Sequence, residues 1–354
     1  MTPFVYESAP VRVLFGTGTV QQLRVEVAHL GVSRALVLST PEQAALGRQC
    51  VASLGELAAG LFAEAAMHTP VEVTERALVM VASCRADALV AIGGGSTTGL
   101  GKAIALRTDL PQIVLPTTYA GSEMTSILGE TENGLKITRR DPRIRPEVVL
   151  YDVDLTLSLP RSLSVTSGLN AIAHAVEALY AVDANPITSM MAEEGVAALT
   201  RALPRINTAD TDTAARWDAL YGAWLCGICL DQTSMALHHK LCHTLGGSFG
   251  LPHAETHSVI LPHAVAYNAA AAAQVMGRLD RALGATGNPA MALHQLARRL
   301  NAPGSLRELG LDEADIGRAA DLAAASPYSN PRRIERAGIE ALLRRAWAGE
   351  APKP

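Results

Sequence analysis

The segment DALVAIGGGSTTGLGKAIAL, residues 87–106, constrains the fold of this chain more than any other part of its sequence. An apolar run, typical of a strand buried on both faces in a parallel sheet, leads here directly into three glycines. Glycines let a backbone approach a phosphate, and the free N–H groups of a following helix bind the anion. The segment therefore predicts that Gly93, Gly94, Gly95 and Ser96 hold a pyrophosphate. A plain strand-to-helix turn is the alternative that the glycines alone leave open.

The rest of the first half repeats this alternation of strands and helices. Apolar, strand-like runs lie at 34–40, 59–66, 112–118 and 146–152, and helical spacing lies at 43–57 and 71–85. Strands that alternate with helices predict an α/β domain with a parallel sheet that helices cover on both faces.

After residue 152 the sequence has the apolar spacing of helices alone. We expect helices at 165–182, 189–206, 215–230, 291–300 and 337–349, with breaks at Pro186, Pro204, Pro252, Pro303 and Pro327. At 354 residues the chain is too long for one ordinary core. We therefore expect two domains, an α/β dinucleotide-binding domain over 1–152 and an all-α catalytic domain over 153–354.

Composition excludes several classes of function. Only 18% of the residues are charged and the formal net charge is −4, so nucleic-acid binding is not expected. No apolar stretch of about 18 residues is free of charges and glycines, and the first residues lack a signal-peptide pattern, so neither a membrane span nor secretion is expected. Five scattered cysteines favour reduced thiols in the cytoplasm. Cys226 and Cys229 form a CxxC in an apolar helix, which we interpret as core packing, with a redox or metal pair as the alternative.

A second loop of small and polar residues follows the expected strand at 112–118. The segment QIVLPTTYAGSEMTSI ends that strand in Thr117 and Thr118 and continues through Gly121 and Ser122. Loops at the carboxyl ends of adjacent parallel strands form the crevice where dinucleotides bind. The GxGxxG fingerprint is absent after the first strand, so the expected dinucleotide site is of another type.

Histidines are concentrated in one stretch, HHKLCHTLGGSFGLPHAETH, which contains five of the ten in the chain. On helical spacing, Asn170 and His174 share one face of a helix, and so do His239 and His243. His253 follows a glycine-rich turn. Because buried imidazoles need partners, two such polar pairs on apolar helices predict an active site, with a polar core network as the alternative.

Four motifs together resemble the iron-containing (group III) alcohol dehydrogenase family. They are GGGS, PTTYAGSE, GLNAIAHAVEALY and HHKLCHTLGGSFGLPHAETHSVILPHAVAYN, and the likeness extends from FGTG at 15–18 to at least Asn268. Within the family the motifs are most similar to those of the maleylacetate reductases. The resemblance implies the dehydroquinate synthase-like fold, in which an α/β nucleotide-binding domain precedes a helical domain, with a catalytic cleft between them and a homodimer.

The same motifs mark the positions that hold Fe²⁺ or Zn²⁺ in metal-dependent members of the family. There one Asp and three His bind the ion, and the matching positions here are Asn170, His174, His239 and His253. An amide oxygen is a neutral, weak ligand, whereas a carboxylate supplies charge. Three imidazoles can still hold zinc, but loss of the anionic ligand points to a vacated site, so no metal is expected. The resemblance attributes the same exchange to maleylacetate reductases.

The resemblance implies reduction of the C=C bond of maleylacetate to 3-oxoadipate in the breakdown of aromatic compounds. Hydride from NADH adds to the alkene carbon β to the ketone, and the resulting enolate is protonated. Hydrogen-bond donors must stabilise the charge on the ketone oxygen. We expect these donors from the imidazoles of His174, His239, His243 and His253, with His243 as the general acid and His253 as the next candidate.

Maleylacetate is a dianion, and its chlorinated analogues are further candidate substrates. A metal-binding Asp would repel it, whereas Asn170, the histidines and nearby Lys240 would attract it. Lys240 can equally lie on a solvated helix face. The resemblance adds Tyr119 as a donor to a substrate carboxylate. We interpret three further histidines as structural groups or neighbours of the site, because nothing in the sequence separates their roles: His238, His257 and His263.

For the cofactor, the resemblance implies NADH. It assigns the pyrophosphate to Gly94, Gly95 and Ser96, the adenine side to Thr117 and Thr118, and nearby contacts to Leu128 and Lys136. Many members carry an Asp in the turn after the first strand, where its charge excludes the 2′-phosphate of NADPH. That turn reads LSTPEQ here, with Thr40 and Pro41, so we expect NADH as the main donor and NADPH tolerated. Gly99 is a second departure, because many members have an Asp there.

Three other functions remain as alternatives at this point. A metal-dependent alcohol dehydrogenase for a small alcohol or aldehyde would require Fe²⁺ or Zn²⁺, which chelator treatment would reveal. A lyase of the dehydroquinate synthase type shares the expected fold but should keep a full metal-ligand set, which Asn170 interrupts. A non-catalytic nucleotide sensor has no need of histidines beside the nicotinamide.

Overall fold

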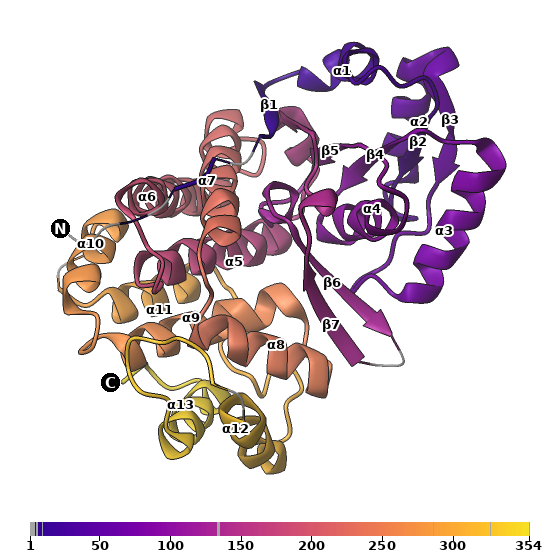
Figure 1. Cartoon of the computed structure of the whole chain (residues 1–354). Helices are drawn as coiled ribbons and strands as arrows, with labels where there is room; N and C mark the ends of the chain where they lie inside the picture. The colour runs from indigo at the N-terminus through magenta and orange to yellow at the C-terminus, as the bar shows by residue number, and fades with distance from the viewer. Residues whose placement is uncertain are drawn as a thin grey trace. The chain divides into compact units, whose positions relative to one another are not determined.

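The computed structural model describes residues 4, 6–8, 10–132, 135–285, 287–325 and 327–353 (Figure 1). The chain divides into two compact units, Ser8–Leu159 and Pro160–Pro354, the latter including the segment Met1–Glu7. Each unit has hydrophobic clusters of its own, which is what independent cores require.

The unit Ser8–Leu159 is built on a six-stranded sheet in which every neighbouring pair of strands is parallel. In spatial order the strands are β1 (Arg12–Gly16), β8 (Val148–Asp152), β5 (Gln112–Pro116), β4 (Ala88–Gly93), β2 (Ala35–Leu38) and β3 (Ala58–Phe62). The parallel sheet that the alternation of strands and helices predicted is confirmed. Strand β1 was not predicted, because its short sequence RVLFG becomes a strand by pairing with β8 from the other end of the unit.

Helices cover both faces of this sheet. One face carries α1 (Leu23–His29) and α2 (Ala44–Leu54), and the other carries α3 (Val71–Cys84) and α4 (Gly95–Thr108). The neighbours Leu36 and Val37 in β2 belong to the two different clusters, because successive strand residues point to opposite faces. Burial on both faces explains why the strands are apolar without alternation.

A separate antiparallel pair, β6 (Ile127–Glu132) and β7 (Leu135–Arg140), lies in the same unit. This pair was not predicted from the sequence. Strand β7 reads LKITRR, and a strand with so few apolar residues has no pattern that distinguishes it from a loop.

In the unit Pro160–Pro354, every regular element of the described residues is helical, as predicted. The α-helices are α5 (Arg161–Leu179), α6 (Pro186–Thr208), α7 (Thr213–Gln232), α8 (Leu237–Phe249), α9 (His253–Asn268), α10 (Ala273–Leu283), α11 (Pro289–Arg299), α12 (Ile316–Ala324) and α13 (Arg336–Ala348). The break expected at Pro204 is wrong, because α6 continues through it. Buried Leu203 and Ile206 hold the last turn on the core, which outweighs the one hydrogen bond that proline cannot make.

Helix α5 lies in the interior of this unit. Its residues from Ser164 to Leu179 are all buried, and it packs against α6, α7 and α9. A helix that is apolar on every side has no face for solvent. Any polar residue on α5 is therefore placed inside the protein and requires a partner there.

The thiols of the CxxC pair lie in the core. Cys226 and Cys229 are free and buried on α7, and a Cβ at Gly195 of α6 would come within 2.8 Å of the Cys226 sulfur. Burial raises the pKa of Cys229 to about 12 and that of Cys226 well above its usual value. Both therefore remain protonated thiols at neutral pH and fill space between the helices.

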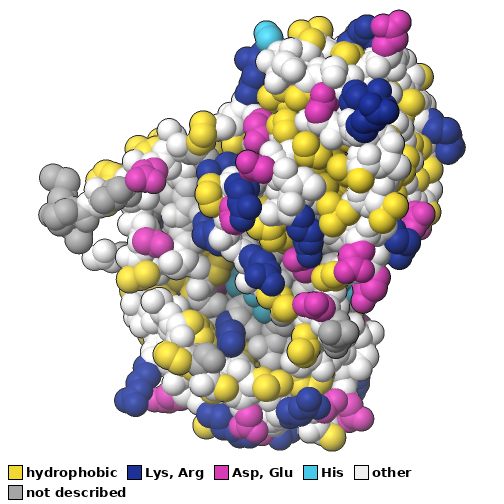
Figure 2. Space-filling model, turned by 45° about the vertical axis from the view of Figure 1, so that its right-hand side comes forward, with side chains coloured by type: hydrophobic (Ala, Val, Ile, Leu, Met, Phe, Trp, Pro, Cys, Tyr) yellow, Lys and Arg dark blue, Asp and Glu magenta, His cyan; other side chains and the backbone are white. Residues whose placement is uncertain are grey.

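Among the described residues, no helix has the length and hydropathy needed to cross a bilayer. Figure 2 shows Lys and Arg side chains interspersed with Asp and Glu over the visible face.

Candidate active site

The loop from Gly93 to Ser96 joins β4 to α4 along a backbone that only glycines can follow closely. A Cβ at Gly93, where φ is +154°, would lie 2.4 Å from Thr97 Oγ1, and one at Gly94 would lie 2.8 Å from Thr118 Cγ2. Gly95 is exposed, and no side chain caps the start of α4. The N–H groups of Thr97 and Thr98 donate to Gly94 O at 3.1 Å, so among the described residues the N–H groups of Gly95 and Ser96 are the ones left for an anion at the start of α4.

The structure brings three predicted loops to one edge of the sheet. Strands β2, β4 and β5 are adjacent and parallel, so Thr40, the glycine loop and Thr117 all follow the same carboxyl edge. Gln43 connects them, since its Nε2 donates a hydrogen bond of 2.8 Å to Thr117 Oγ1. Gln43 was not predicted, because a polar residue at a helix start carries no distinctive sequence signal.

A buried lysine fixes the second loop, and the sequence analysis missed it as well. Lys102 of α4 is fully buried, and its Nζ donates to Ser122 O at 2.5 Å, Thr125 Oγ1 at 2.8 Å and Ile127 O at 2.9 Å. A fully buried lysine needs such partners. The signal was a single cation in the apolar helix sequence LGKAIAL.

The other residues predicted in this unit are Tyr119 for a substrate carboxylate and Leu128 and Lys136 for the cofactor. Tyr119 is fully buried, and Leu128 packs in a small cluster with Ala103 and Ile144. The side chain of Lys136 lies outside the described residues.

Gly99 departs from many family members for a steric reason that the sequence did not reveal. A Cβ at Gly99 would lie 2.3 Å from Thr69 Oγ1, so α4 approaches Thr69 more closely than a side chain would allow. An aspartate at this position would require the side chain of Thr69 to move away.

In the helical unit, four buried side chains form one continuous hydrogen-bonded chain, the histidine chain. Asn170, His174 and Glu177 lie on one face of α5, and His239 comes from α8. Asn170 Nδ2 lies 3.3 Å from His174 Nε2, His174 Nδ1 lies 2.8 Å from His239 Nε2, and His239 Nδ1 lies 2.8 Å from Glu177 Oε2.

Glu177 anchors this chain and was not predicted. Its carboxylate also accepts backbone N–H groups at the start of α8, from Ala236 at 2.7 Å and from His238 at 2.8 Å. Burial opposes ionisation of Glu177, but these hydrogen bonds and that of His239 outweigh it, so its pKa lies below the usual value. The missed signal was one acid, a turn after His174, on an otherwise apolar helix.

The ionised Glu177 fixes the tautomers along the histidine chain. A carboxylate only accepts, so neutral His239 carries its proton on Nδ1 and accepts at Nε2. His174 must then donate from Nδ1 and accept at Nε2, and the Asn170 amide donates to that nitrogen. In this neutral chain, the N–H groups of His174 and His239 are both engaged within the protein.

His243 and His253 extend the cluster towards solvent. The His243 ring centroid lies 6.1 Å from that of His239 and 6.3 Å from that of His253. His243 is exposed, whereas His253 is half-buried, as is Lys240. The structure therefore brings the four predicted histidines together in one group.

Comparison with known proteins identifies the family. Residues 10–153 match the iron-containing alcohol dehydrogenase model, and residues 164–347 match the Fe-containing alcohol dehydrogenase family, C-terminal. The chain belongs to this family. A maleylacetate reductase of Rhizobium sp. (strain MTP-10005) is 57% identical over 353 residues, which is 100% of each chain. The resemblance inferred from the sequence motifs is thereby confirmed, and the chain is an oxidoreductase.

Solved structures agree with this assignment. The crystal structure of maleylacetate reductase from Agrobacterium tumefaciens has a TM-score of 0.96 and 56% identity, over 99% of this chain and 100% of that chain. The sulfoacetaldehyde reductase of Bifidobacterium kashiwanohense, solved in complex with NAD⁺, is 20% identical with a TM-score of 0.89, over 98% of this chain and 99% of that chain. At that identity the likeness shows the fold alone.

The donor set at the family's metal positions does not fit Fe²⁺. Asn170, His174, His239 and His253 are all uncharged ligands when the imidazoles are neutral. Two nitrogens bound to one tetrahedral ion at about 2.0–2.1 Å lie about 3.3 Å apart. The facing nitrogens of His174 and His239 are only 2.8 Å apart and share a proton. Asn170 Oδ1, buried without a hydrogen-bond partner, is one neutral oxygen in place of a carboxylate.

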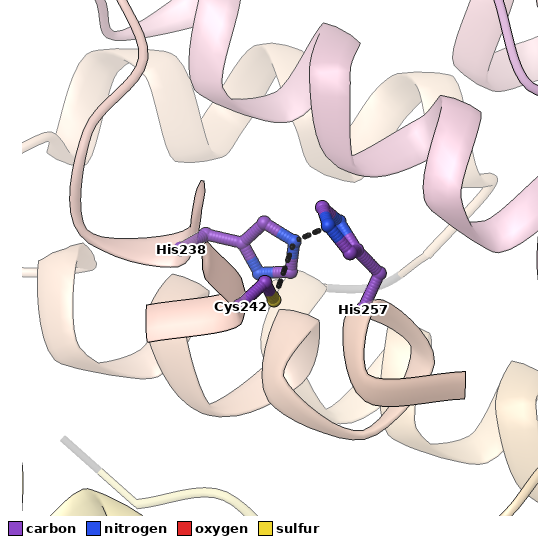
Figure 3. A group of neighbouring side chains, drawn as sticks. All are labelled: His238, Cys242 and His257. Atoms are coloured by element: carbon purple, nitrogen blue, oxygen red, sulfur yellow. Dashed lines mark hydrogen bonds between the residues drawn. The ribbon is translucent and has the colours of Figure 1, made fainter. Parts of the chain in front are cut away.

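A second group of three buried side chains adjoins the histidine chain: His238, Cys242 and His257 (Figure 3). His238 Nε2 lies 2.9 Å from His257 Nδ1, and Cys242 Sγ lies 3.7 Å from His238 Nε2. Burial, and secondarily the neighbouring histidines, hold the pKa of His238 and of His257 well below the usual value. Both rings are therefore neutral at physiological pH.

His263 belongs to a different environment. It is buried on α9, and burial, followed by the nearby positive groups His294 and Arg345, lowers its pKa to about 4. The three histidines whose roles the sequence left open thus separate into a pair beside the histidine chain and one apart from it.

Proposed function

We propose that this chain reduces the C=C bond of maleylacetate with NADH, giving 3-oxoadipate in the breakdown of aromatic compounds, and that it does so without a metal. The observation that carries the proposal is the uncharged Asn170–His174–His239 chain where metal-dependent members bind an ion. Relatives that cover the whole chain at 57% and 56% identity, both named maleylacetate reductase, support the substrate.

The nucleotide site supports NADH as the hydride donor. The glycine loop and the start of α4 would hold the pyrophosphate, and the polar edge formed by Gln43, Thr117 and Thr118 would contact the rest of the dinucleotide. When bound, NADH supplies a hydride to the alkene carbon β to the ketone of the substrate.

The side chains of the protein bind the charged substrate and supply the proton. With Asn170 in place of a carboxylate, that position carries no negative charge to repel a dianion, and the charge of Glu177 is held at the far end of the histidine chain by hydrogen bonds from His239 and Ala236. Tyr119 and Lys240 are proposed contacts of the substrate carboxylates. The exposed imidazole of His243 can exchange protons with solvent and delivers one to the carbon next to the ketone.

Chelator treatment tests the metal-free mechanism. We expect purified protein, dialysed against a strong chelator, to oxidise NADH with maleylacetate at an unchanged rate, because no step uses an ion. Elemental analysis should find no stoichiometric iron or zinc. A metal-dependent alcohol dehydrogenase, the rival within the family, would instead lose activity on chelation and regain it on adding Fe²⁺ or Zn²⁺.

A matched variant sharpens this test. Asn170→Asp restores the anionic ligand, and we expect it to raise the affinity for Zn²⁺ and to lower kcat/KM for maleylacetate by about tenfold or more, through charge repulsion in a partly buried site. Unchanged turnover of the dianion in Asn170→Asp, with no gain in zinc binding, would contradict the role given to the amide.

Coenzyme preference depends on the turn after β2. Thr40 and Pro41 are uncharged, but the exposed carboxylate of Glu42 follows, and hydrogen bonds from its own backbone N–H and from Thr40 lower its pKa. An anion here disfavours a 2′-phosphate. We expect NADH to be preferred and NADPH to be accepted at a lower kcat/KM, and Glu42→Gln to raise the NADPH value about tenfold. No measurable NADPH activity in either form would disprove the tolerance.

Two further features are part of the proposal. The free cysteines fit a reducing, cytoplasmic location, and the family resemblance implies a homodimer, which light scattering in solution would test. Chlorinated maleylacetates remain candidate substrates for the same reaction.

A further inference from the structure

The proposed reaction needs hydrogen-bond donors at the ketone oxygen, where negative charge develops as hydride arrives. His174 and His239 have their N–H groups engaged in the histidine chain. His257 differs from both. Its Nδ1 faces His238, and its Nε2 is buried with no hydrogen-bond partner among the described residues. A buried ring nitrogen without a hydrogen bond lowers the stability of the fold unless a ligand supplies that hydrogen bond.

His257 lies at the centre of the histidine cluster. Its ring centroid is 4.4 Å from that of His253, 5.1 Å from that of His239 and 6.1 Å from that of His174. These are the three histidines at the family's metal positions. The ring of His257, whose side chain is fully buried, therefore adjoins the histidines at all three of these positions.

The partner of His257 decides which of its nitrogens carries the proton. One proton is shared between His238 Nε2 and His257 Nδ1. If His257 donated it, a buried N–H would remain on His238 Nδ1, which also has no partner, and His257 Nε2 would be a bare acceptor. Ionised maleylacetate has only acceptor oxygens, so in that state it could not form a hydrogen bond with His257 Nε2. If His238 donates, His257 presents Nε2–H, which an oxygen can accept.

We propose that His257, oriented by His238, donates its Nε2–H to the ketone oxygen of the substrate and stabilises the enolate. The inference rests on the proposed function. Hydride adds to the alkene carbon β to the ketone, the alkene electrons form a new C=C bond to the carbonyl carbon, and the carbonyl electrons move onto oxygen. His243 then protonates the carbon next to the ketone while His257 keeps its proton. The sum is substrate, NADH and H⁺ giving product and NAD⁺.

The alternative occupant of this group is a metal ion held by His238, Cys242 and His257, whose ligand atoms lie within 4.8 Å of one another. The 2.9 Å between the two nitrogens is shorter than the separation of about 3.3 Å on a tetrahedral ion. Metal-bound imidazoles also donate their outer N–H to an acceptor, and none is present for either ring among the described residues. A hydrogen bond fits the geometry better.

Kinetics of two substitutions test the donor. His257→Leu removes it, and we expect kcat to fall by about 10²–10³-fold with KM and NADH affinity nearly unchanged, because the oxygen becomes charged only in the transition state. His257→Gln keeps a distal N–H and should recover about tenfold or more of that loss. An unchanged kcat in His257→Leu, or a loss confined to KM, would overturn the assignment.

The matched control is His263→Leu, which removes a buried histidine from the same helix away from the cluster. It should unfold at a similar temperature to His257→Leu but keep nearly full activity. If both variants lose kcat equally, the effect of His257 is structural and the proposal fails.

A measurement without turnover separates this inference from the proposed function. Nitrogen-15 NMR of labelled histidine side chains should show His257 as the Nε2–H tautomer, and His238→Leu should abolish that preference. The Nδ1–H tautomer, or stoichiometric zinc that Cys242→Ser removes, would overturn the proposal. Failure of the wild type to oxidise NADH with maleylacetate would instead refute the proposed function. The NMR measurement would still show which nitrogen of His257 carries the proton.

Discussion

Replacing His243 with alanine is expected to lower kcat for maleylacetate reduction by about 10²–10⁴-fold, the usual contribution of a positioned general acid. His243 is exposed, one turn after His239 on α8, and its ring stacks at 6.3 Å on that of His253. A solvent-accessible imidazole can be reprotonated after each turnover. Stopped-flow measurement of NADH oxidation gives the loss, and fluorescence titration should show that NADH still binds with nearly unchanged affinity.

Exogenous imidazole provides the control for this variant. Because His243 is exposed, the cavity left by alanine is open to small molecules, and added imidazole should restore part of the lost rate. His253→Ala, the next candidate acid, should lose activity without such rescue, since His253 is half-buried beside His257. Full activity in His243→Ala would show that His243 is not the general acid. If imidazole rescued only His253→Ala, His253 would be the acid instead.

Glu177→Gln is expected to destabilise the helical unit by about 3 kcal/mol and to lower kcat as well. Glu177 Oε2 accepts from the Ala236 N–H and from His239 Nδ1, and Oε1 accepts from the His238 N–H. Whichever way the amide of glutamine turns, its NH₂ group faces a donor that the carboxylate satisfied. His239 also loses the anion that fixes its tautomer. The nitrogen that carries the proton is then no longer fixed in either ring of the histidine chain.

Urea unfolding, monitored by tryptophan fluorescence, measures the stability of the helical unit in which Glu177 lies. All three tryptophans, Trp217, Trp224 and Trp347, lie in the helical unit. Glu194→Gln is the matched control, because Glu194 is an exposed acid on α6 whose pairing with Arg201 at 3.6 Å should contribute little. Equal stability of the two variants would show that Glu177 does not anchor α8.

Together the two substitutions separate the functions of the histidines. His243 is the proposed acid and is exposed at the edge of the cluster, so its loss should affect turnover and leave stability nearly intact. Glu177 acts through hydrogen bonds buried in the core, so its loss should affect both. A buried charge that loses its matched partners costs far more than a solvated side chain that is removed.

Much of the fold was predictable because it follows from local patterns. The apolar run before Gly93 indicated a strand covered on both faces, and the glycines indicated a helix start open to an anion. Strand β1 and the pair β6–β7 were not predictable in this way, because neither RVLFG nor LKITRR has a pattern that distinguishes it from a loop. Their strand character comes from partners distant in sequence.

The candidate site was likewise predictable only in part. Helical spacing joined Asn170 to His174 and His239 to His243, and an amide at a carboxylate position pointed away from a metal. Spacing on single helices cannot tell which helices meet. Only the packing of α5 against the start of α8 brings Glu177 to His239, and only the approach of α8 and α9 brings His238 to His257.

By itself, then, the sequence determined that Asn170 and the histidines lie on helices and which of them share a helix face, but it did not reveal Glu177. The tertiary structure decided which of those groups hold each other's protons and which remain available to a substrate. The physical reason is that a hydrogen bond between helices depends on a few ångströms of separation and on the direction of a ring nitrogen. Both are set by how buried helices pack and not by residue order along any one of them.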